Sequence, residues 1–148
     1  MKTYEYIVVG GGPAGIFSAI YAGSCGIKTA ILEKKNRMGK KILIAGSGQC
    51  NITHTGEVKD FLTKYGDHGK FLRTAIYKYS PKDLQNFFKD HGLELVPRED
   101  GKIFPITRRS VDVVELLYSL CKKHNVDIIE NCEVLSITHR DDFTLNTS

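Results

Sequence analysis

Three glycines spaced as G-x-G-x-x-G are the residues of this sequence whose type and spacing most directly indicate chemistry. They are Gly10, Gly12 and Gly15, between an apolar run at residues 6–9 and a helix-like pattern of small residues. Gly10 permits a tight strand-to-helix turn, Gly12 leaves room for a phosphate, and Gly15 lets the helix pack closely on the strand. The main-chain N–H groups that open such a helix favour an anion. The spacing therefore predicts a site for the pyrophosphate of a dinucleotide.

An acidic residue, Glu33, stands 18 positions after Gly15, at the end of a second apolar run at residues 29–32. A carboxylate in this place accepts hydrogen bonds from ribose hydroxyls and repels a 2′-phosphate, so we expect an unphosphorylated adenosine ribose. Pro13 suits the first turn of the intervening helix, where its missing N–H costs nothing. A glycine-rich turn of some other α/β protein is the alternative. The acid at the expected spacing favours a βαβ nucleotide unit.

The composition is that of an ordinary globular domain. The 148 residues are 41% hydrophobic and 26% charged, with a net charge of +4. Lys and Arg are scattered rather than striped, so we expect no nucleic-acid partner. The apolar runs are too short to cross a membrane, a strand begins almost at the first residue, and the four cysteines form no C-x-x-C pair. We therefore expect a cytoplasmic protein with one domain, residues 1–148, and no signal peptide.

The stretch after Glu33 departs from an ordinary nicotinamide-binding unit. Residues 34–41 are rich in Lys and Arg, and residues 45–51 are rich in glycine. A backbone-rich segment of this kind can lie against a large planar or phosphorylated ligand. The local excess of positive charge that includes Lys40 and Lys41 fits a diphosphate, and solvated loop lysines are the alternative.

Residues 4–51 resemble the aminoacetone oxidase family of FAD-binding enzymes, a group of NAD(P)/FAD-dependent oxidoreductases that includes bacterial bile-acid reductases. The family pattern is GGGPAG, then a strand ending in Glu-Lys, R-x-G-K/R-K and S-G-G-G-R-C-N. This chain has the corresponding segments at residues 10–15, 33–34, 37–41 and 45–51. The resemblance implies an α/β, Rossmann-like FAD-binding fold with a parallel sheet and a helical plus β-hairpin insertion.

The same resemblance implies which residues bind FAD, with NAD(P)H as a possible electron donor. Two positions depart from the pattern, because Ser47 replaces a glycine and Gln49 replaces an arginine. Gln49 keeps hydrogen-bonding capacity but loses the charge. In similar flavoproteins, the main chain at the position of Val134 bonds the adenine. The implied set is Gly10, Gly12, Pro13, Ala14, Gly15, Glu33, Lys34, Lys40, Lys41, Gly46, Gly48, Gln49, Cys50, Asn51 and Val134.

Family members are more than twice as long, so we expect this chain to be a truncated, N-terminal part without the substrate domain and the segment that closes over the flavin. A non-catalytic dinucleotide-binding fragment and an NAD-binding dehydrogenase domain remain alternatives. The sequence gives no substrate, electron acceptor, catalytic residue or oligomeric state. Cys50 and His54 lack a second pair of metal ligands at suitable spacing, so we predict no metal site and a buried, inert thiol at position 50.

Downstream of residue 51 the pattern predicts further elements. Periodic apolar residues predict a helix over 70–79 and another from the cap Ser80 to Gly92. Residues 93–104 predict a hairpin with its turn at Asp100 and Gly101. The remaining expectations are a helix from Ser110 to about Asn125, strands over 126–130 and 131–140, and an opening hairpin arm without a return over 142–147.

Overall fold

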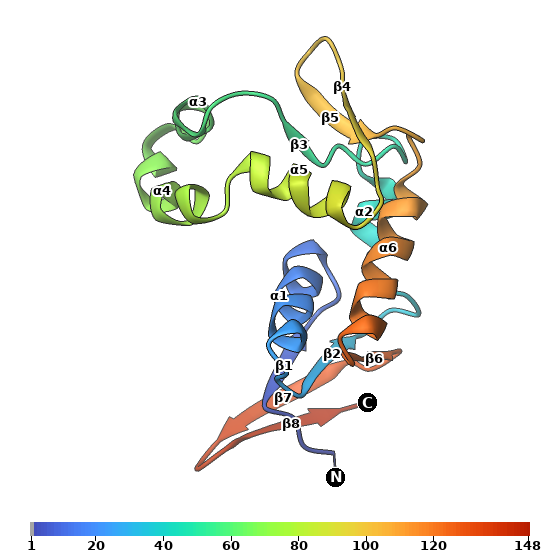
Figure 1. Cartoon of the computed structure of the whole chain (residues 1–148). Helices are drawn as coiled ribbons and strands as arrows, with labels where there is room; N and C mark the ends of the chain where they lie inside the picture. Colours follow the sequence, from blue (N-terminus) through green and yellow to red (C-terminus); the bar gives the residue numbers. More distant parts are fainter. Residues whose placement is uncertain (1) are drawn as a thin grey trace. The chain divides into compact units, whose positions relative to one another are not determined.

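The computed structural model describes residues 2–148 and divides the chain into two compact units (Figure 1). One unit comprises the residues up to 43 together with residues 114–148, and the other comprises residues 44–113. No linker or shift in composition marks an internal boundary in the sequence. Across the described residues, no helix has the length and apolar character needed to span a bilayer.

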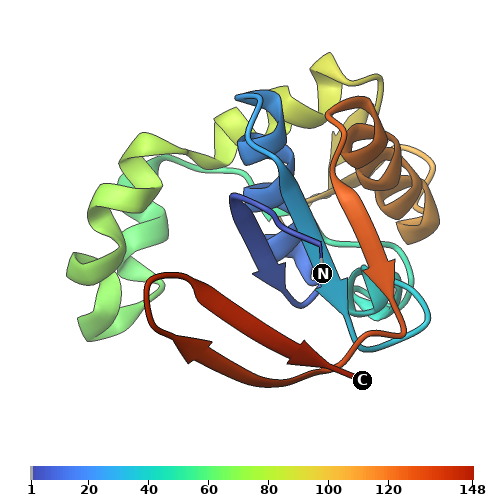
Figure 2. The same cartoon turned by 90° about the horizontal axis from the view of Figure 1, so that it is seen from below.

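A parallel sheet forms the centre of the first unit (Figure 2). Its strands are β1 (Tyr6–Val9), β2 (Thr29–Glu33) and β6 (Asp127–Glu130), in the order β1-β2-β6. The middle strand is buried along residues 29–32, because it has a neighbour on each side. The predicted parallel sheet is confirmed.

Helix α1 (Pro13–Ser24) connects β1 to β2 and packs against both. It begins at Pro13, with Gly12 in extended conformation at the N-cap. It ends where Gly26 adopts a φ of +80° and Ile27 N–H donates to the Ala22 carbonyl at 3.2 Å. A glycine with positive φ after the last turn is a common helix stop, because it has no Cβ to clash. The βαβ unit predicted from the sequence is therefore present.

Two further helices cross the boundary between the units. Helix α6 (Ser110–Lys123) has residues on both sides of it, and its Val114, Leu117 and Cys121 are almost fully buried. Its bounds agree with the predicted helix to within two residues at the C-terminal end. Helix α2 (Lys40–Ile44) is a single short turn that the sequence analysis did not anticipate.

The last two strands correct one prediction. Strand β7 (Val134–His139) pairs in antiparallel register with β8 (Phe143–Thr147), so that Ile137 lies opposite Leu145. Residues 142–147 are therefore not the opening arm of an incomplete hairpin, and that prediction is wrong. The connection between His139 and Phe143 contains no glycine or proline, so the sequence carried only a weak turn signal.

The second unit contains the predicted helical and hairpin insertion. Helix α5 (Pro81–Asp90) begins as predicted, because Ser80 Oγ accepts from Asp83 N–H and the Asp83 carboxylate accepts from Ser80 N–H. The hairpin turn at Gly101 has a φ of +81°. The elements are β3 (Thr53–His54), α3 (Val58–Thr63), η1 (Gly66–His68), α4 (Gly69–Lys78), α5 (Pro81–Asp90), β4 (Leu95–Pro97) and β5 (Lys102–Pro105), with sheet order β3-β5-β4.

Candidate dinucleotide site

The three glycines of the turn between β1 and α1 have different surroundings and backbone angles. Gly10 has a φ of +101°, which L side chains rarely adopt. A Cβ on Gly15 would overlap the Gly10 carbonyl oxygen and lie 2.8 Å from Val8 Cγ1, so this glycine permits the close packing of helix on strand. A Cβ on Gly12 would meet nothing within 4 Å. The turn is therefore tightly packed at Gly15 and open at Gly12.

The carboxylate of Glu33 points at this turn. Its Oε2 accepts a hydrogen bond from Gly11 N–H at 2.8 Å, and its Oε1 accepts one from Lys35 N–H at 2.8 Å. The residue is half-buried at the end of β2. Each carboxylate oxygen can accept more than one hydrogen bond, so both oxygens keep acceptor capacity for the hydroxyls of a ribose.

The segment that follows β2 folds back onto the turn, and we call residues 34–39 the cover loop. Gly39 N–H donates to the Gly11 carbonyl at 2.7 Å. A Cβ on Gly11 would overlap Met38 Cβ and lie 3.2 Å from Glu33 Oε2. Met38 is fully buried. Gly11 and Met38 are thus part of the site architecture, although the sequence analysis assigned neither of them.

Two side chains from elsewhere in the unit hold the cover loop. Met38 N–H lies 2.8 Å from Glu130 Oε1 and 3.1 Å from the Tyr118 hydroxyl oxygen. The Tyr118 hydroxyl donates to the same Glu130 oxygen. Burial, and then this hydrogen bond, raises the pKa of Tyr118 to about 12. Sequence reasoning missed both residues, and the only signal was that Glu130, like Glu33, ends a predicted strand.

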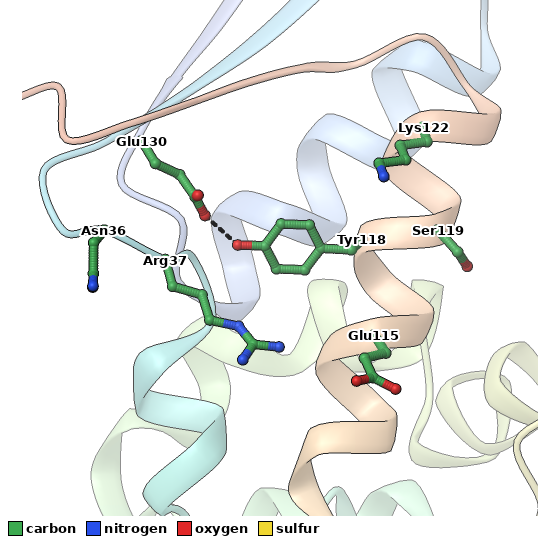
Figure 3. A pocket seen from close by; sticks show the side chains of 7 residues that line it. All are labelled: Asn36, Arg37, Glu115, Tyr118, Ser119, Lys122 and Glu130. Atoms are coloured by element: carbon green, nitrogen blue, oxygen red, sulfur yellow. Dashed lines mark hydrogen bonds between the residues drawn. The ribbon is translucent and has the colours of Figure 1, made fainter.

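Beside this pair lies an open pocket of about 410 Å³ (Figure 3). The guanidinium carbon of Arg37 sits 5.8 Å from the centre of the Tyr118 ring. The pocket is lined by Asn36, Arg37, Glu115, Tyr118, Ser119, Lys122 and Glu130.

Several other predicted residues lie in the same unit as the turn. Cys132 N–H donates to the Glu33 carbonyl at 3.0 Å, which brings the start of β7 and its half-buried Val134 near Glu33. Lys34 is exposed, 3.8 Å from the Glu133 carboxylate, a geometry that contributes little to stability. Lys40 and Lys41 are exposed in the short helix α2, which follows directly from the cover loop.

The glycine-rich segment from Gly46 to Asn51 belongs to the second unit. Positive φ angles at Gly46, Ser47, Gly48 and Cys50 coil it tightly. The Gln49 amide donates to the Gly46 carbonyl and the Cys50 amide donates to the carbonyl of Ala45, just before the segment, so these two N–H groups already have partners. Burial raises the pKa of the Cys50 thiol to about 11, which keeps it protonated near neutral pH. The thiol is buried, as predicted.

Residues 4–148 match the family model described as HI0933-like protein Rossmann domain. The chain is 27% identical over 147 residues to the ribosomal RNA dihydrouridine synthase of Escherichia coli (strain K12), covering 99% of this chain and 36% of that protein. It is 33% identical over 129 residues to the 3-dehydro-bile acid delta(4,6)-reductase of Clostridium scindens, covering 86% of this chain and 31% of that protein. This chain thus spans about a third of the length of these curated relatives.

Solved structures share the fold. The open conformation of a flavocytochrome c3 fumarate reductase superposes with a TM-score of 0.71 at 17% identity, over 95% of this chain and 29% of that chain. Thermovibrio ammonificans THI4 superposes with a TM-score of 0.60 at 14% identity, over 96% of this chain and 45% of that chain.

Proposed function

This chain belongs to the HI0933-like protein Rossmann-domain family, and from that premise we propose that it binds FAD as the cofactor-binding part of an oxidoreductase. The observation that carries the proposal is the pairing of Glu33 with the glycine turn. An acid that accepts from Gly11 N–H stands beside Gly12, where an added Cβ would meet nothing within 4 Å.

The residues present fit the adenosine and pyrophosphate parts of FAD. The amides of Ala14 and Gly15 lie in the first turn of α1, where N–H groups have no partner within the helix. Together with the helix dipole they favour the pyrophosphate over the open face of Gly12. Glu33 then accepts from the ribose hydroxyls. The main chain at Val134 bonds the adenine, because Val134 follows closely on Cys132, whose N–H donates to the Glu33 carbonyl.

When bound, the flavin supplies hydride and electron transfer. The residues of this chain bind and orient it: the turn and Glu33 fix the adenosine half, and Lys34, Lys40 and Lys41 supply positive charge. NAD(P)H is the electron donor that the resemblance to the aminoacetone oxidase and bile-acid reductase group suggests.

Cofactor release and titration test the proposal. The purified chain is heated to release bound cofactor, and the apoprotein is titrated with FAD, FMN and NAD while flavin fluorescence and binding heat are followed. We expect FAD to bind more tightly than FMN or NAD. A chain that carries no flavin and takes up no FAD contradicts the proposal, and preferential saturation by NAD points to a dehydrogenase domain. FAD binding without reductase or oxidase turnover indicates a non-catalytic binding module.

A second candidate concerns the substrate, and helix α4 is the observation that favours it. This helix carries Lys70, Arg73 and Lys78, all exposed, without an acidic residue, and Phe71 is 87% exposed. Cations beside an exposed aromatic ring suit single-stranded nucleic acid, which departs from the sequence-based expectation of no such partner. Since the E. coli relative is named for ribosomal RNA, we propose RNA as the substrate class to test first.

Fluorescence anisotropy with a labelled oligoribonucleotide tests this candidate. The double variant Lys70→Glu/Arg73→Glu is expected to weaken binding at least ~10-fold through lost phosphate contacts, whereas Lys82→Glu/Lys89→Glu in α5, both exposed, serves as a matched double charge reversal outside α4. Equal weakening by both variants, or no binding by the unaltered chain, rejects α4 as an RNA surface.

A further inference from the structure

We propose that Tyr118 and Glu130 are positioning residues for the adenosine half of the dinucleotide, acting through the cover loop rather than by touching the ligand. The inference rests on the proposed function, because it presupposes that the glycine turn and Glu33 hold an adenine dinucleotide. It assigns a role to two residues that no sequence motif singled out.

The cover loop determines the shape of the turn. Gly39 N–H bonds to the Gly11 carbonyl at 2.7 Å, and Met38 packs so closely that no Cβ fits on Gly11. The Gly11 amide is also the group that holds Glu33 Oε2 at 2.8 Å. A displacement of Met38 therefore moves Gly11, and a displacement of Gly11 moves the carboxylate of Glu33, which the proposed function places at the ribose.

Hydrogen bonds fix the cover loop at both of its ends. At the beginning of the loop, Lys35 N–H donates to Glu33 Oε1 at 2.8 Å, and the Lys35 carbonyl accepts from Asn131 N–H at 2.9 Å. At its far end, Met38 N–H is held by Glu130 and Tyr118. Tyr118 and Glu130 thus fix Met38, the residue of the cover loop that packs on Gly11.

The hydrogen bonds that fix Met38 end on a charged group. Glu130 Oε1 accepts from both Met38 N–H and the Tyr118 hydroxyl, and Figure 3 shows the tyrosine ring extending from α6 to meet the carboxylate. Hydrogen bonds to a carboxylate are stronger than those between neutral groups. The raised pKa of Tyr118 is consistent with a hydroxyl that keeps its proton in this bond. Loss of the hydroxyl removes the donor that orients the Glu130 oxygen toward Met38.

Four single variants separate positioning from simple structural damage. Tyr118→Phe removes only the hydroxyl, Glu130→Ala removes the acceptor, and Glu130→Gln keeps an oxygen that can accept from Met38 N–H. Tyr21→Phe is the matched control, because Tyr21 is a 74% exposed tyrosine on α1. Each variant is titrated with FAD, ADP and FMN by fluorescence or calorimetry, and its thermal unfolding sets a working temperature at which it is folded.

We expect Tyr118→Phe to weaken FAD and ADP binding at least about 10-fold, the lower end of what one hydrogen bond to a charged group supports. Glu130→Ala weakens both further, and Glu130→Gln restores affinity to within about threefold of the unaltered chain. FMN, which lacks the adenosine, binds equally to all variants, and Tyr21→Phe changes nothing. This dependence on the adenosine is a readout that a general loss of stability does not produce.

The failures are distinguishable. If the unaltered chain binds neither FAD nor ADP, the proposed function fails and this inference with it. If FAD binds tightly but Tyr118→Phe and Glu130→Ala leave its affinity unchanged, or weaken FMN to the same degree, the positioning role is rejected while the proposed function stands.

Discussion

Substitution of alanine at two glycines of the same turn is expected to separate binding from stability. Gly12 lies at the N-cap of α1 with φ −81° and ψ 172°, an extended conformation that alanine adopts freely, and its Cβ would meet nothing within 4 Å. Gly15 lies three residues later, and its Cβ would overlap the Gly10 carbonyl oxygen. Gly12→Ala therefore adds a methyl group to open space, whereas Gly15→Ala adds one to a packed interface.

The expected magnitudes follow from these surroundings. Gly12→Ala gains about 0.4–1 kcal/mol by restricting the unfolded chain and loses about the same because alanine is a poor N-cap, so its free energy of unfolding changes by less than about 1 kcal/mol. At Gly15 the added carbon lies 2.8 Å from Val8 Cγ1, far inside the optimal carbon separation of roughly 3.5–4 Å. Overpacking of this kind costs about 1–3 kcal/mol. Since the overlapped atom belongs to the backbone, we expect the upper end.

Thermal melts and FAD titrations check both values. With about 2–4 °C of melting temperature per kcal/mol for a chain of this size, Gly15→Ala is expected to melt about 6–12 °C lower. Gly12→Ala is expected to melt within ~4 °C of the unaltered chain but to bind FAD at least ~10-fold more weakly, because the methyl group takes the place of the pyrophosphate. A Gly12→Ala variant that melts as low as Gly15→Ala, or that binds FAD normally, refutes the division of roles.

Three further outcomes are expected. Glu33→Gln replaces an acceptor oxygen that faces the Gly11 amide with an NH₂ group, so FAD and ADP affinity falls about 10-fold while FMN affinity, measured in the same titration, is unchanged. The pKa of Tyr118 is raised from its ordinary value of 10.0 to about 12, so as the pH rises the unfolded chain loses the hydroxyl proton before the folded chain does. The free energy of unfolding therefore falls between pH 10 and 12. The urea midpoint should fall less across that range for Tyr118→Phe than for the unaltered chain. Of the four cysteines, only Cys25 is exposed and burial raises the pKa of Cys50 to about 11, so Ellman's reagent at pH 8 should find one fast thiol in the folded chain and four in denaturant.

Local patterns in the sequence were sufficient to predict the βαβ unit. Apolar runs, a glycine turn with Pro13 at the helix start, and an acid at the end of the second run all act within about thirty residues. The capping box at Ser80 and the glycine of the hairpin turn at Gly101 are local in the same way. Each of these predictions is confirmed because the determining contacts lie close together in the chain.

The features that the sequence analysis missed depend on contacts between distant residues. Tyr118 reaches Met38 across 80 positions, and Glu130 reaches it across 92. No periodicity in a single element predicts that a helix side chain and a strand-end carboxylate meet one amide. The return strand at residues 143–147 was missed for a related reason, because its pairing depends on register with β7 and its turn lacks a glycine.

The two strand-end acids show why position in a motif is not sufficient to assign a ligand. Glu33 and Glu130 lie directly opposite each other on neighbouring parallel strands, and both carboxylates accept from backbone amides. They differ in the segment that each one binds. Glu33 accepts from the amide of Gly11 in the turn, and Glu130 accepts from the amide of Met38 in the cover loop. Because Met38 in turn packs on Gly11, the second acid constrains the first. Binding of an adenine dinucleotide should therefore depend on both acids, directly on Glu33 and through the loop on Glu130.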